Sequence, residues 1–198
     1  MLRKIESWLK KNLKKKEEAK IQRGLQIQNH IVDINGTDYY FGKGSITDIP
    51  DIVNVEEEVY DKKAAWDRER FLNDLKKHKN SLYMVIRKAD ELIAFVGCYI
   101  SRDSKNCHVE NIAVLPKFQN RGLGYFLLTM VIRRARLMKL RSVSVETRLS
   151  NIKAQDLNRD LGFIQVGIDP DYYNDGEDAV VMKLDLSKQK VAPNNFGR

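Results

Sequence analysis

The chain has 198 residues, of which 42% are hydrophobic and 31% are charged, as expected for a globular domain with its own core. Its apolar runs are far shorter than the roughly 20 residues of a membrane-spanning helix, and its N-terminus lacks the apolar region of a secretory signal. Two cysteines and three histidines provide neither a disulfide framework nor a metal-ligand spacing, so we expect a cytoplasmic protein without a metal site.

The N-terminal segment is predicted to be a basic amphipathic helix. The net charge is +8, and Met1–Arg23 holds nine Lys or Arg residues against three Glu. Apolar residues recur there at helical spacing: Leu2, Ile5, Leu9 and Leu13. Asn35-Gly36 then indicates a turn. We therefore assign residues 1–38 to an N-terminal extension, with a boundary near Thr37.

The remaining chain alternates between strand and helix patterns. Apolar alternation and turn residues predict seven strands, at residues 39–45, 82–87, 92–100, 108–114, 143–148, 163–168 and 179–186. Helical periodicity and capping residues predict helices at residues 48–60, 65–78, 122–138 and 151–161. This order indicates an α/β (α+β) domain with a mixed sheet over residues 39–187. Residues 188–198 are polar and are predicted to form a flexible tail.

The strongest local motif is Gln119-Asn120-Arg121-Gly122-Leu123-Gly124, which lies between a predicted strand and the helix that follows it. Glycines allow backbone N–H groups to turn toward an anion without interference from a Cβ atom. The N-terminus of the helix adds unpaired donors and the positive end of the helix dipole. The loop therefore suits a pyrophosphate group, but two glycines alone would equally fit a flexible helix start.

The surrounding sequence resembles the GNAT superfamily of N-acetyltransferases. The superfamily signature Arg/Gln-x-x-Gly-x-Gly/Ala is met by Gln119, Gly122 and Gly124, and residues 111–116 resemble the fourth strand of the family. The resemblance covers residues 39–186. It implies a twisted, mostly antiparallel sheet of about six to seven strands flanked by helices. It also implies direct transfer of an acetyl group from acetyl-CoA to an amine, without a metal.

Further motifs are similar to one branch of the superfamily, the ribosomal-protein alanine N-acetyltransferases. Val145–Asn151 reads Val-Glu-Thr-Arg-Leu-Ser-Asn, against Leu-Glu-Val-Arg-x-Ser-Asn in that branch. Four segments carry the similarity: Trp66 with Phe71, Val145–Asn151, Leu161–Phe163, and Tyr172–Met182. The branch implies that the acceptor is the N-terminal α-amine of a ribosomal protein. Residues 1–38 have no counterpart in the pattern.

The resemblance also implies which residues contact the cofactor. The backbone amides of Gln119, Asn120, Arg121, Gly122, Leu123 and Gly124 would hold the pyrophosphate. The strand through Ile112 and Val114 would pair with the pantetheine arm and hold the thioester carbonyl. Asn151 would contact the cofactor from the start of the next helix, and it is also a favoured helix N-cap residue.

Glu146 is the candidate general base. An α-amine, with a pKa of about 8, needs less help to lose its proton than a lysine at about 10.4, and a carboxylate suits that task. The alternative is a carboxylate that is exposed or paired to Arg148. His108 and Glu110 share a face of the preceding strand and are rival bases, although a half-exposed strand face explains them equally well.

The general acid is the point where the sequence departs from the family. Many members carry a Tyr seven residues beyond the Asn of Ser-Asn, and here that position is Asn158. An amide donates a hydrogen bond but does not release a proton. Asn158 is therefore expected to hold the departing sulfur by hydrogen bonding, or Tyr173 with its neighbour Tyr172 supplies the proton. The alternatives are a solvated helix residue at Asn158 and tyrosines that only cover the sheet edge.

Two other readings of the chain remain. The enzyme could take lysine or a small amine as acceptor, or the domain could bind acyl-CoA on the ribosome without catalysis. The basic segment 1–23 suits a contact with ribosomal RNA or an anionic membrane surface. Packing of its apolar stripe onto the domain, or a dimer contact, is the competing interpretation.

Overall fold

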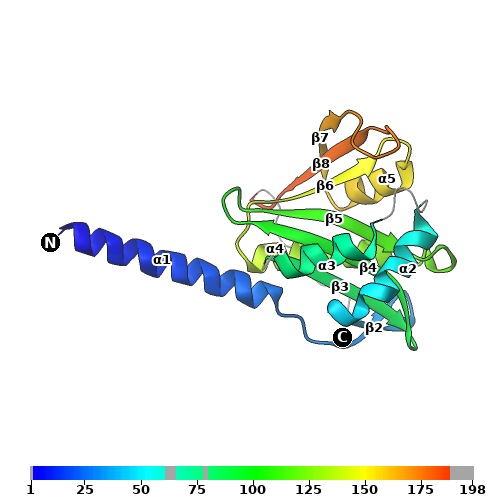
Figure 1. Cartoon of the computed structure of the whole chain (residues 1–198), viewed down its shortest axis with the longest axis horizontal. Helices are drawn as coiled ribbons and strands as arrows, with labels where there is room; N and C mark the ends of the chain where they lie inside the picture. Colours follow the sequence, from blue (N-terminus) through cyan, green and yellow to red (C-terminus); the bar gives the residue numbers. More distant parts are fainter. Residues whose placement is uncertain (1, 61–65, 78–79, 188–198) are drawn as a thin grey trace.

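The centre of the fold is a mixed sheet of eight strands in the order β1-β2-β3-β4-β5-β6-β8-β7 (Figure 1). In this computed structural model, residues 2–60, 66–77 and 80–187 are described. Neighbouring strands are antiparallel except β5 and β6, which run parallel. The strands are β1 His30–Ile34, β2 Thr37–Lys43, β3 Ser81–Lys88, β4 Glu91–Ser101, β5 Asn106–Val114, β6 Ser142–Arg148, β7 Ile164–Asp169 and β8 Ala179–Asp185.

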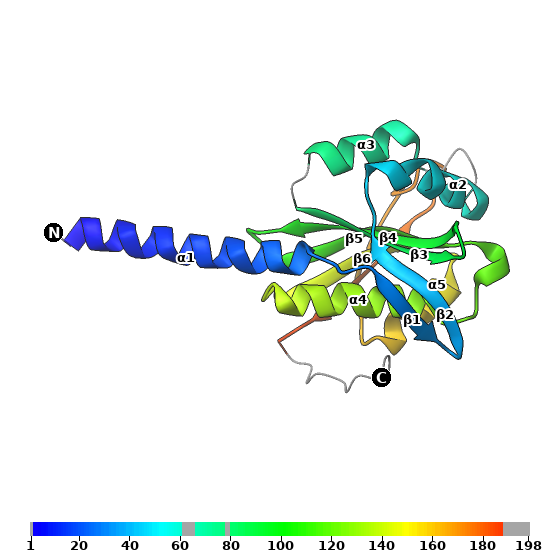
Figure 2. The same ribbon diagram turned by 90° about the horizontal axis from the view of Figure 1, so that it is seen from below.

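Helices cover both faces of this sheet, with α2 and α3 on one side and α4 and α5 on the other (Figure 2). On α4, the apolar residues Leu127, Val131 and Ala135 form one buried stripe, as the helical spacing predicts. The described α-helices are α1 Leu2–Leu25, α2 Ile49–Val59, α3 Arg68–Lys77, α4 Leu123–Leu137 and α5 Ile152–Asp160. Short 3-10 turns lie at Ile46–Asp48 and Pro116–Phe118. The predicted mixed, mostly antiparallel fold is confirmed.

The sheet has one strand more than the sequence predicts. Strand β1 lies within the segment 1–38 that we assigned to the extension, and it pairs with β2 from His30↔Phe41 to Ile34↔Thr37. The predicted turn at Asn35-Gly36 joins the two strands, with φ values of 52° and 78°. Two successive left-handed residues give the tight turn that matches the twist of a β-hairpin. The sheet therefore begins before Thr37.

The C-terminal end of α1 packs against α4. Ile21 and Leu25 are buried in the core, and Arg134 on α4 donates a hydrogen bond of 2.7 Å from Nη1 to the carbonyl of Gln26. Two ion pairs flank this contact, from Glu17 to Lys105 and from Glu18 to Arg102. The last turns of α1 are thus part of the domain.

The N-terminal part of α1 projects away from the sheet (Figures 1 and 2). Trp8 and Leu13 are 63% and 62% exposed, so the described part of the predicted apolar stripe is not covered. The side chains of Leu2, Ile5 and Leu9 lie outside the described residues, as does the predicted tail at 188–198. Among the described residues, no helix combines the length and apolar character needed to cross a membrane.

Candidate active site

Strands β5 and β6 separate halfway along their length. Residues 106–109 of β5 pair in parallel with residues 142–145 of β6. Beyond them, β5 continues to Val114 and β6 to Arg148. The edges of these two strand segments are therefore open toward each other, at the centre of the sheet.

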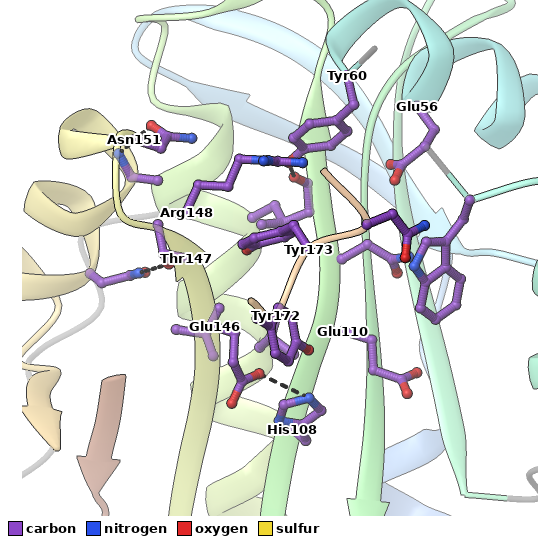
Figure 3. A pocket seen from close by; sticks show the side chains of 18 of the residues that line it. Glu56, Tyr60, His108, Glu110, Glu146, Thr147, Arg148, Asn151, Tyr172 and Tyr173 are labelled. Atoms are coloured by element: carbon purple, nitrogen blue, oxygen red, sulfur yellow. Dashed lines mark hydrogen bonds and ion pairs between the residues drawn. The ribbon is translucent and has the colours of Figure 1, made fainter. Parts of the chain in front are cut away.

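A cavity of about 370 Å³ opens where the two strands separate (Figure 3). It is the place where the predicted catalytic residues meet Ile112 and Asn151, whereas Val114 and the loop 119–124 lie outside its lining. The following residues line it: Glu56, Tyr60, Trp66, Arg70, His108, Val109, Glu110, Asn111, Ile112, Val145, Glu146, Thr147, Arg148, Asn151, Ala154, Asn158, Tyr172, Tyr173 and Asn174. The candidate base, its rivals and the tyrosine pair thus share one space.

Glu146 and His108 are in direct contact across β6 and β5. His108 Nε2 lies 3.1 Å from Glu146 Oε2 (Figure 3), and His108 Nδ1 lies 3.1 Å from Ser144 Oγ. Burial raises the pKa of Glu146 to about 7, and nearby Asp169 adds to this shift. Burial also lowers the pKa of His108. The distance would suit an ion pair, but both pKa shifts favour the neutral forms, and Glu146 Oε2 has no hydrogen-bond partner in the described structure.

Two further carboxyl groups enter the same cavity. Burial raises the pKa of Glu110 to about 7, with Asp74 adding to the shift, and burial also raises the pKa of Glu56 to about 7. One oxygen of each, Oε2, is buried without a hydrogen-bond partner in the described structure. Buried polar groups are normally satisfied. Each of these two carboxyl groups therefore has unused acceptor capacity beside the cavity.

Aromatic side chains close the cavity opposite the sheet. The rings of Tyr172 and Tyr173 meet edge to face, with centroids 5.0 Å apart. Arg148 Cζ lies 4.0 Å from the ring centroid of Tyr173, and its Nη1 donates to Glu177 at 2.6 Å. Burial raises the pKa of Tyr173 to about 12, with Tyr172 adding to the shift. The Tyr173 hydroxyl therefore keeps its proton at neutral pH.

The predicted phosphate loop joins β5 to α4. Asn120 and Gly122 both have left-handed backbones, with φ of 60° and 86°, and Gly122 is the residue that caps α4. Left-handed residues in such a turn direct N–H groups into a concavity that suits an anion, and the first N–H groups of a helix have no intrahelical partner. Gln119 Nε2 holds the loop by donating to the carbonyl of Val114 at 3.0 Å.

A second cavity connects the loop to the first one. It is lined by Gln119 on the loop and by Tyr60, Arg148 and Asn151, which also line the first cavity. Asn151 caps α5, because its Oδ1 accepts a hydrogen bond from the Ala154 N–H at 3.1 Å. The capping role expected for Asn151 is confirmed, and its position between the cavities also suits a ligand contact.

Asn158 faces the protein interior. It is 3% exposed, and its Nδ2 donates to Thr147 Oγ1 at 3.1 Å and to Met182 Sδ at 3.5 Å. Both hydrogens of this amide are thus used within the fold. The alternative interpretation of Asn158 as a solvated helix residue is therefore wrong.

Sequence reasoning missed two residues that α2 contributes to the cavity. Tyr60 donates from its hydroxyl to the carbonyl of Ile112 at 2.9 Å, on the open edge of β5. Glu56 lies on the buried side of α2 beside Ile52 and Val55. A Glu within an apolar helix face was the available signal for Glu56, whereas the contact of Tyr60 depends on tertiary packing alone.

Comparisons with known proteins agree with this geometry. The chain matches the acetyltransferase (GNAT) family over residues 46–163. It is 30% identical over 146 residues to the ribosomal protein bS18-alanine N-acetyltransferase of Salmonella typhimurium, covering 72% of this chain and 95% of that protein. It is 35% identical over 126 residues to the corresponding enzyme of Haemophilus ducreyi, covering 61% and 83%.

Solved structures show the same fold. The crystal structure of the ribosomal-protein-S18-alanine N-acetyltransferase from Escherichia coli superposes with a TM-score of 0.68 at 26% identity, covering 79% of this chain and 97% of that chain. The protein yncA of Salmonella typhimurium, solved with its cofactor acetyl-CoA, superposes with a TM-score of 0.65 at 17% identity, covering 80% and 99%. The fold is that of an acetyltransferase. The chain belongs to the GNAT family.

Proposed function

We propose that this enzyme uses acetyl-CoA to acetylate the N-terminal α-amine of a ribosomal protein. The observation that carries the proposal is the position of Glu146, a half-buried carboxyl with a pKa of about 7. It lies where β5 and β6 separate, in the cavity that the second cavity connects to the phosphate loop. Relatives at 30% and 35% identity carry the name of bS18-alanine N-acetyltransferases, which supports the choice of acceptor.

The residues present fit acetyl-CoA. The left-handed loop at Asn120 and Gly122 and the N-terminus of α4 suit the pyrophosphate. The unpaired edge of β5 at Ile112 suits a pantetheine amide, and Asn151 lines both cavities. At Val114 the carbonyl already accepts from Gln119. When bound, the cofactor supplies an activated acetyl group as a thioester. The hydroxyl of Tyr60 already donates to the carbonyl of Ile112, so a pantetheine donor would use the second lone pair of that oxygen or replace Tyr60 there.

The acceptor amine would lose its proton to Glu146. A carboxyl with a pKa of about 7 is close to the operating pH and to the pKa of an α-amine at about 8, which makes it an effective base. His108 Nε2 lies 3.1 Å from Glu146 Oε2, close enough to accept that proton from the carboxyl group. Glu110 and Glu56 line the same cavity and are further candidate acceptors for polar groups of the acceptor protein.

Tyr173 is the better placed of the two candidate acids. Its hydroxyl keeps its proton at neutral pH and it lines the same cavity as Glu146. Both N–H groups of the Asn158 amide donate within the fold, to Thr147 and Met182. We therefore assign Asn158 to positioning of the β6 segment that carries Glu146. A thiol, with a pKa of about 8.5 by analogy with Cys, needs only modest assistance to depart.

We further propose that α1 contacts ribosomal RNA. The described side chains of Lys11, Lys14, Lys15, Lys16 and Lys20 are exposed. Three successive lysines at about 100° intervals spread charge over about 200° of the helix circumference, more than the single polar face that a membrane-surface helix sets against its apolar face. Residues 111–145, which include α4 beside the base of α1, hold seven Lys or Arg and no acidic residue (Figure 2).

The RNA contact is tested by anisotropy with a labelled double-stranded RNA across a salt series. Changing Lys14, Lys15 and Lys16 to Gln should weaken binding and reduce the salt slope by up to about three. A control variant with Gln at three other exposed lysines, Lys43, Lys153 and Lys183, should bind as the wild type does. Equal RNA affinity of the two variants, or preferential binding to phosphatidylserine vesicles, would contradict the contact.

The acetyl transfer is tested by intact-mass analysis of a recombinant ribosomal protein with a free N-terminal alanine. Incubation with enzyme and acetyl-CoA should add one acetyl group, which fragmentation should locate on the α-amine. The same protein with a formylated N-terminus should stay unmodified. Acetylation of spermidine or of lysine side chains, with the α-amine unchanged, would show that the acceptor class is wrong.

A further inference from the structure

The turn between β1 and β2 reaches the phosphate loop, although 86 residues separate them in sequence. Asn35 Nδ2 donates a hydrogen bond of 3.1 Å to the carbonyl of Arg121. The family match begins at residue 46, so this contact comes from a part of the chain that lies before it. We propose that Asn35 is a positioning residue that sets the orientation of the phosphate loop for cofactor binding. This inference rests on the proposed use of acetyl-CoA.

The hydrogen bond fixes the direction of a neighbouring donor. A trans peptide is planar, and its C=O and N–H groups point in opposite directions. Because the carbonyl of Arg121 points toward the hairpin, the N–H of Gly122 in the same peptide points away from it. Holding this one carbonyl therefore presents the Gly122 N–H on the side opposite the hairpin.

The packing between turn and loop leaves little freedom. A Cβ atom added to Gly122 would lie 2.8 Å from Asn35 Nδ2 and 3.4 Å from Ile34 Cγ2. Ile34 is fully buried, so the hairpin is a firm support. The loop thus rests directly on the amide of Asn35, and the glycine at this position allows both the left-handed backbone and the close approach.

Asn35 also meets the local requirements of its own turn. Its backbone is left-handed, with φ of 52°, and Asn tolerates this region better than most residues other than Gly. Asn35→Gly therefore preserves the turn and removes only the side chain. Asn35→Asp keeps the shape but replaces the donating NH₂ with a negative charge beside a loop that is to hold an anion. These two substitutions separate the hydrogen bond from the turn conformation.

The test is calorimetric titration of CoA into the full chain, together with steady-state kinetics. Loss of one neutral hydrogen bond should weaken CoA binding about three- to tenfold in Asn35→Gly. We expect a larger loss in Asn35→Asp, partly relieved by salt. The KM for acetyl-CoA should rise in parallel, whereas kcat at saturating cofactor should stay within about twofold, because the residue positions the loop and not the reacting atoms.

Asn29→Ala provides a matched control. Asn29 Oδ1 accepts from the Lys43 N–H at 3.2 Å, so this variant disturbs the same hairpin without touching the loop. Asn29→Ala should leave the affinity for CoA unchanged, with a melting temperature similar to that of Asn35→Gly. If Asn35→Gly and Asn29→Ala lose stability equally and both bind CoA as the wild type does, Asn35 is only structural and the inference is wrong. Failure of the wild type itself to bind CoA would instead overturn the proposed function.

Discussion

His108 Nε2 lies 3.1 Å from Glu146 Oε2 at the level where β5 and β6 stop pairing. His108 is in register with Ser144, inside the paired segment, whereas Glu146 is the first residue of β6 beyond it. The strand separation therefore opens the cavity directly beside a pair of side chains that can exchange a proton. The candidate base and one of its rivals therefore lie side by side.

Glu146→Gln should lower kcat/KM by about 10²–10⁴, the usual contribution of a general base, and leave the affinity for CoA unchanged. His108→Ala should cause a smaller loss, because the carboxyl remains in place. Initial rates on an N-terminal alanine peptide, with calorimetry for CoA, measure both effects. A Glu146→Gln rate within about threefold of wild type, together with a large loss in Glu110→Gln, would move the base to Glu110.

The carboxyl groups of the site should make stability depend on pH in opposite directions. The pKa of Glu110 is raised to about 7, so the folded state keeps a proton that the unfolded state releases near 4.5. Ionisation of Glu110 therefore leaves the free energy of unfolding unchanged below about pH 4.5 and lowers it as pH rises through 7. Glu110→Gln should raise the free energy of unfolding at pH 8, by on the order of 1–2 kcal/mol, and have little effect at pH 4.

Glu177 serves as the comparison. Hydrogen bonds from Ser150 lower its pKa to about 2, and Arg148 adds to this shift. The ionised form of Glu177 stabilises the fold at pH values above the pKa that this group has in the unfolded state. This stabilisation is lost as pH falls toward 2. Glu177→Gln should therefore lower the melting temperature at pH 8, where Glu110→Gln raises it. Equal shifts of the same sign in the two variants would contradict the assignment of these pKa values.

The sequence predicted most of the fold because its signals are local. Alternation along β6 and the apolar stripe of α4 reveal a strand and a helix without tertiary information. Strand β1 was missed because it is short and mostly exposed, with Ile34 as its one buried residue, so its pattern does not alternate. The Asn-Gly turn after it is a strong hairpin signal and would have placed a strand on each side of residues 35–36.

The candidate site also has a part that local motifs predict and a part that they do not. Glu146 and Gly122 lie in motifs with fixed spacing, so the sequence identified them. The hydrogen bonds from Tyr60 to the Ile112 carbonyl and from Asn35 to the Arg121 carbonyl join distant segments through main-chain atoms. No pattern of residue types records such contacts, because any residue supplies the accepting carbonyl.

The two glycines of the phosphate loop should respond differently to substitution. Gly122 has φ of 86°, and a Cβ there would meet Asn35 at 2.8 Å, whereas a Cβ on Gly124 would meet only Leu157 Cδ2, at 3.3 Å. Gly122→Ala should cost about 1–2 kcal/mol in backbone strain alone and weaken CoA binding. Gly124→Ala should be tolerated, because the Leu157 side chain can shift. Thermal melts and CoA titrations of both variants test this order.

Truncations should separate the projecting part of α1 from the part that supports the sheet. Deleting residues 1–16 removes no side chain described as buried, so the domain should stay folded and acetylate a short peptide. Deleting residues 1–36 also removes the buried side chains of Ile21, Leu25 and Ile34. At about 1.5–3 kcal/mol each, their loss approaches the whole stability of a domain. Soluble, active protein starting at Thr37 would contradict this view.

The last prediction separates two ways of assisting the leaving thiol: proton donation by Tyr173 and hydrogen bonding by the amide of Asn158. Tyr173→Phe should lower kcat about tenfold or more at pH 7, with less effect at higher pH, where a thiol with a pKa of about 8.5 departs unaided. Asn158→Ala removes a buried hydrogen bond to Thr147, so it should cost about 1 kcal/mol of stability and little activity. Asn158→Tyr should destabilise the buried site by about 1–3 kcal/mol through overpacking. If Tyr173→Phe keeps the wild-type rate and pH profile while Asn158→Ala is slow, the leaving thiol needs no proton from Tyr173. The Asn158 amide then assists its departure by hydrogen bonding, and Tyr173 only covers the cavity.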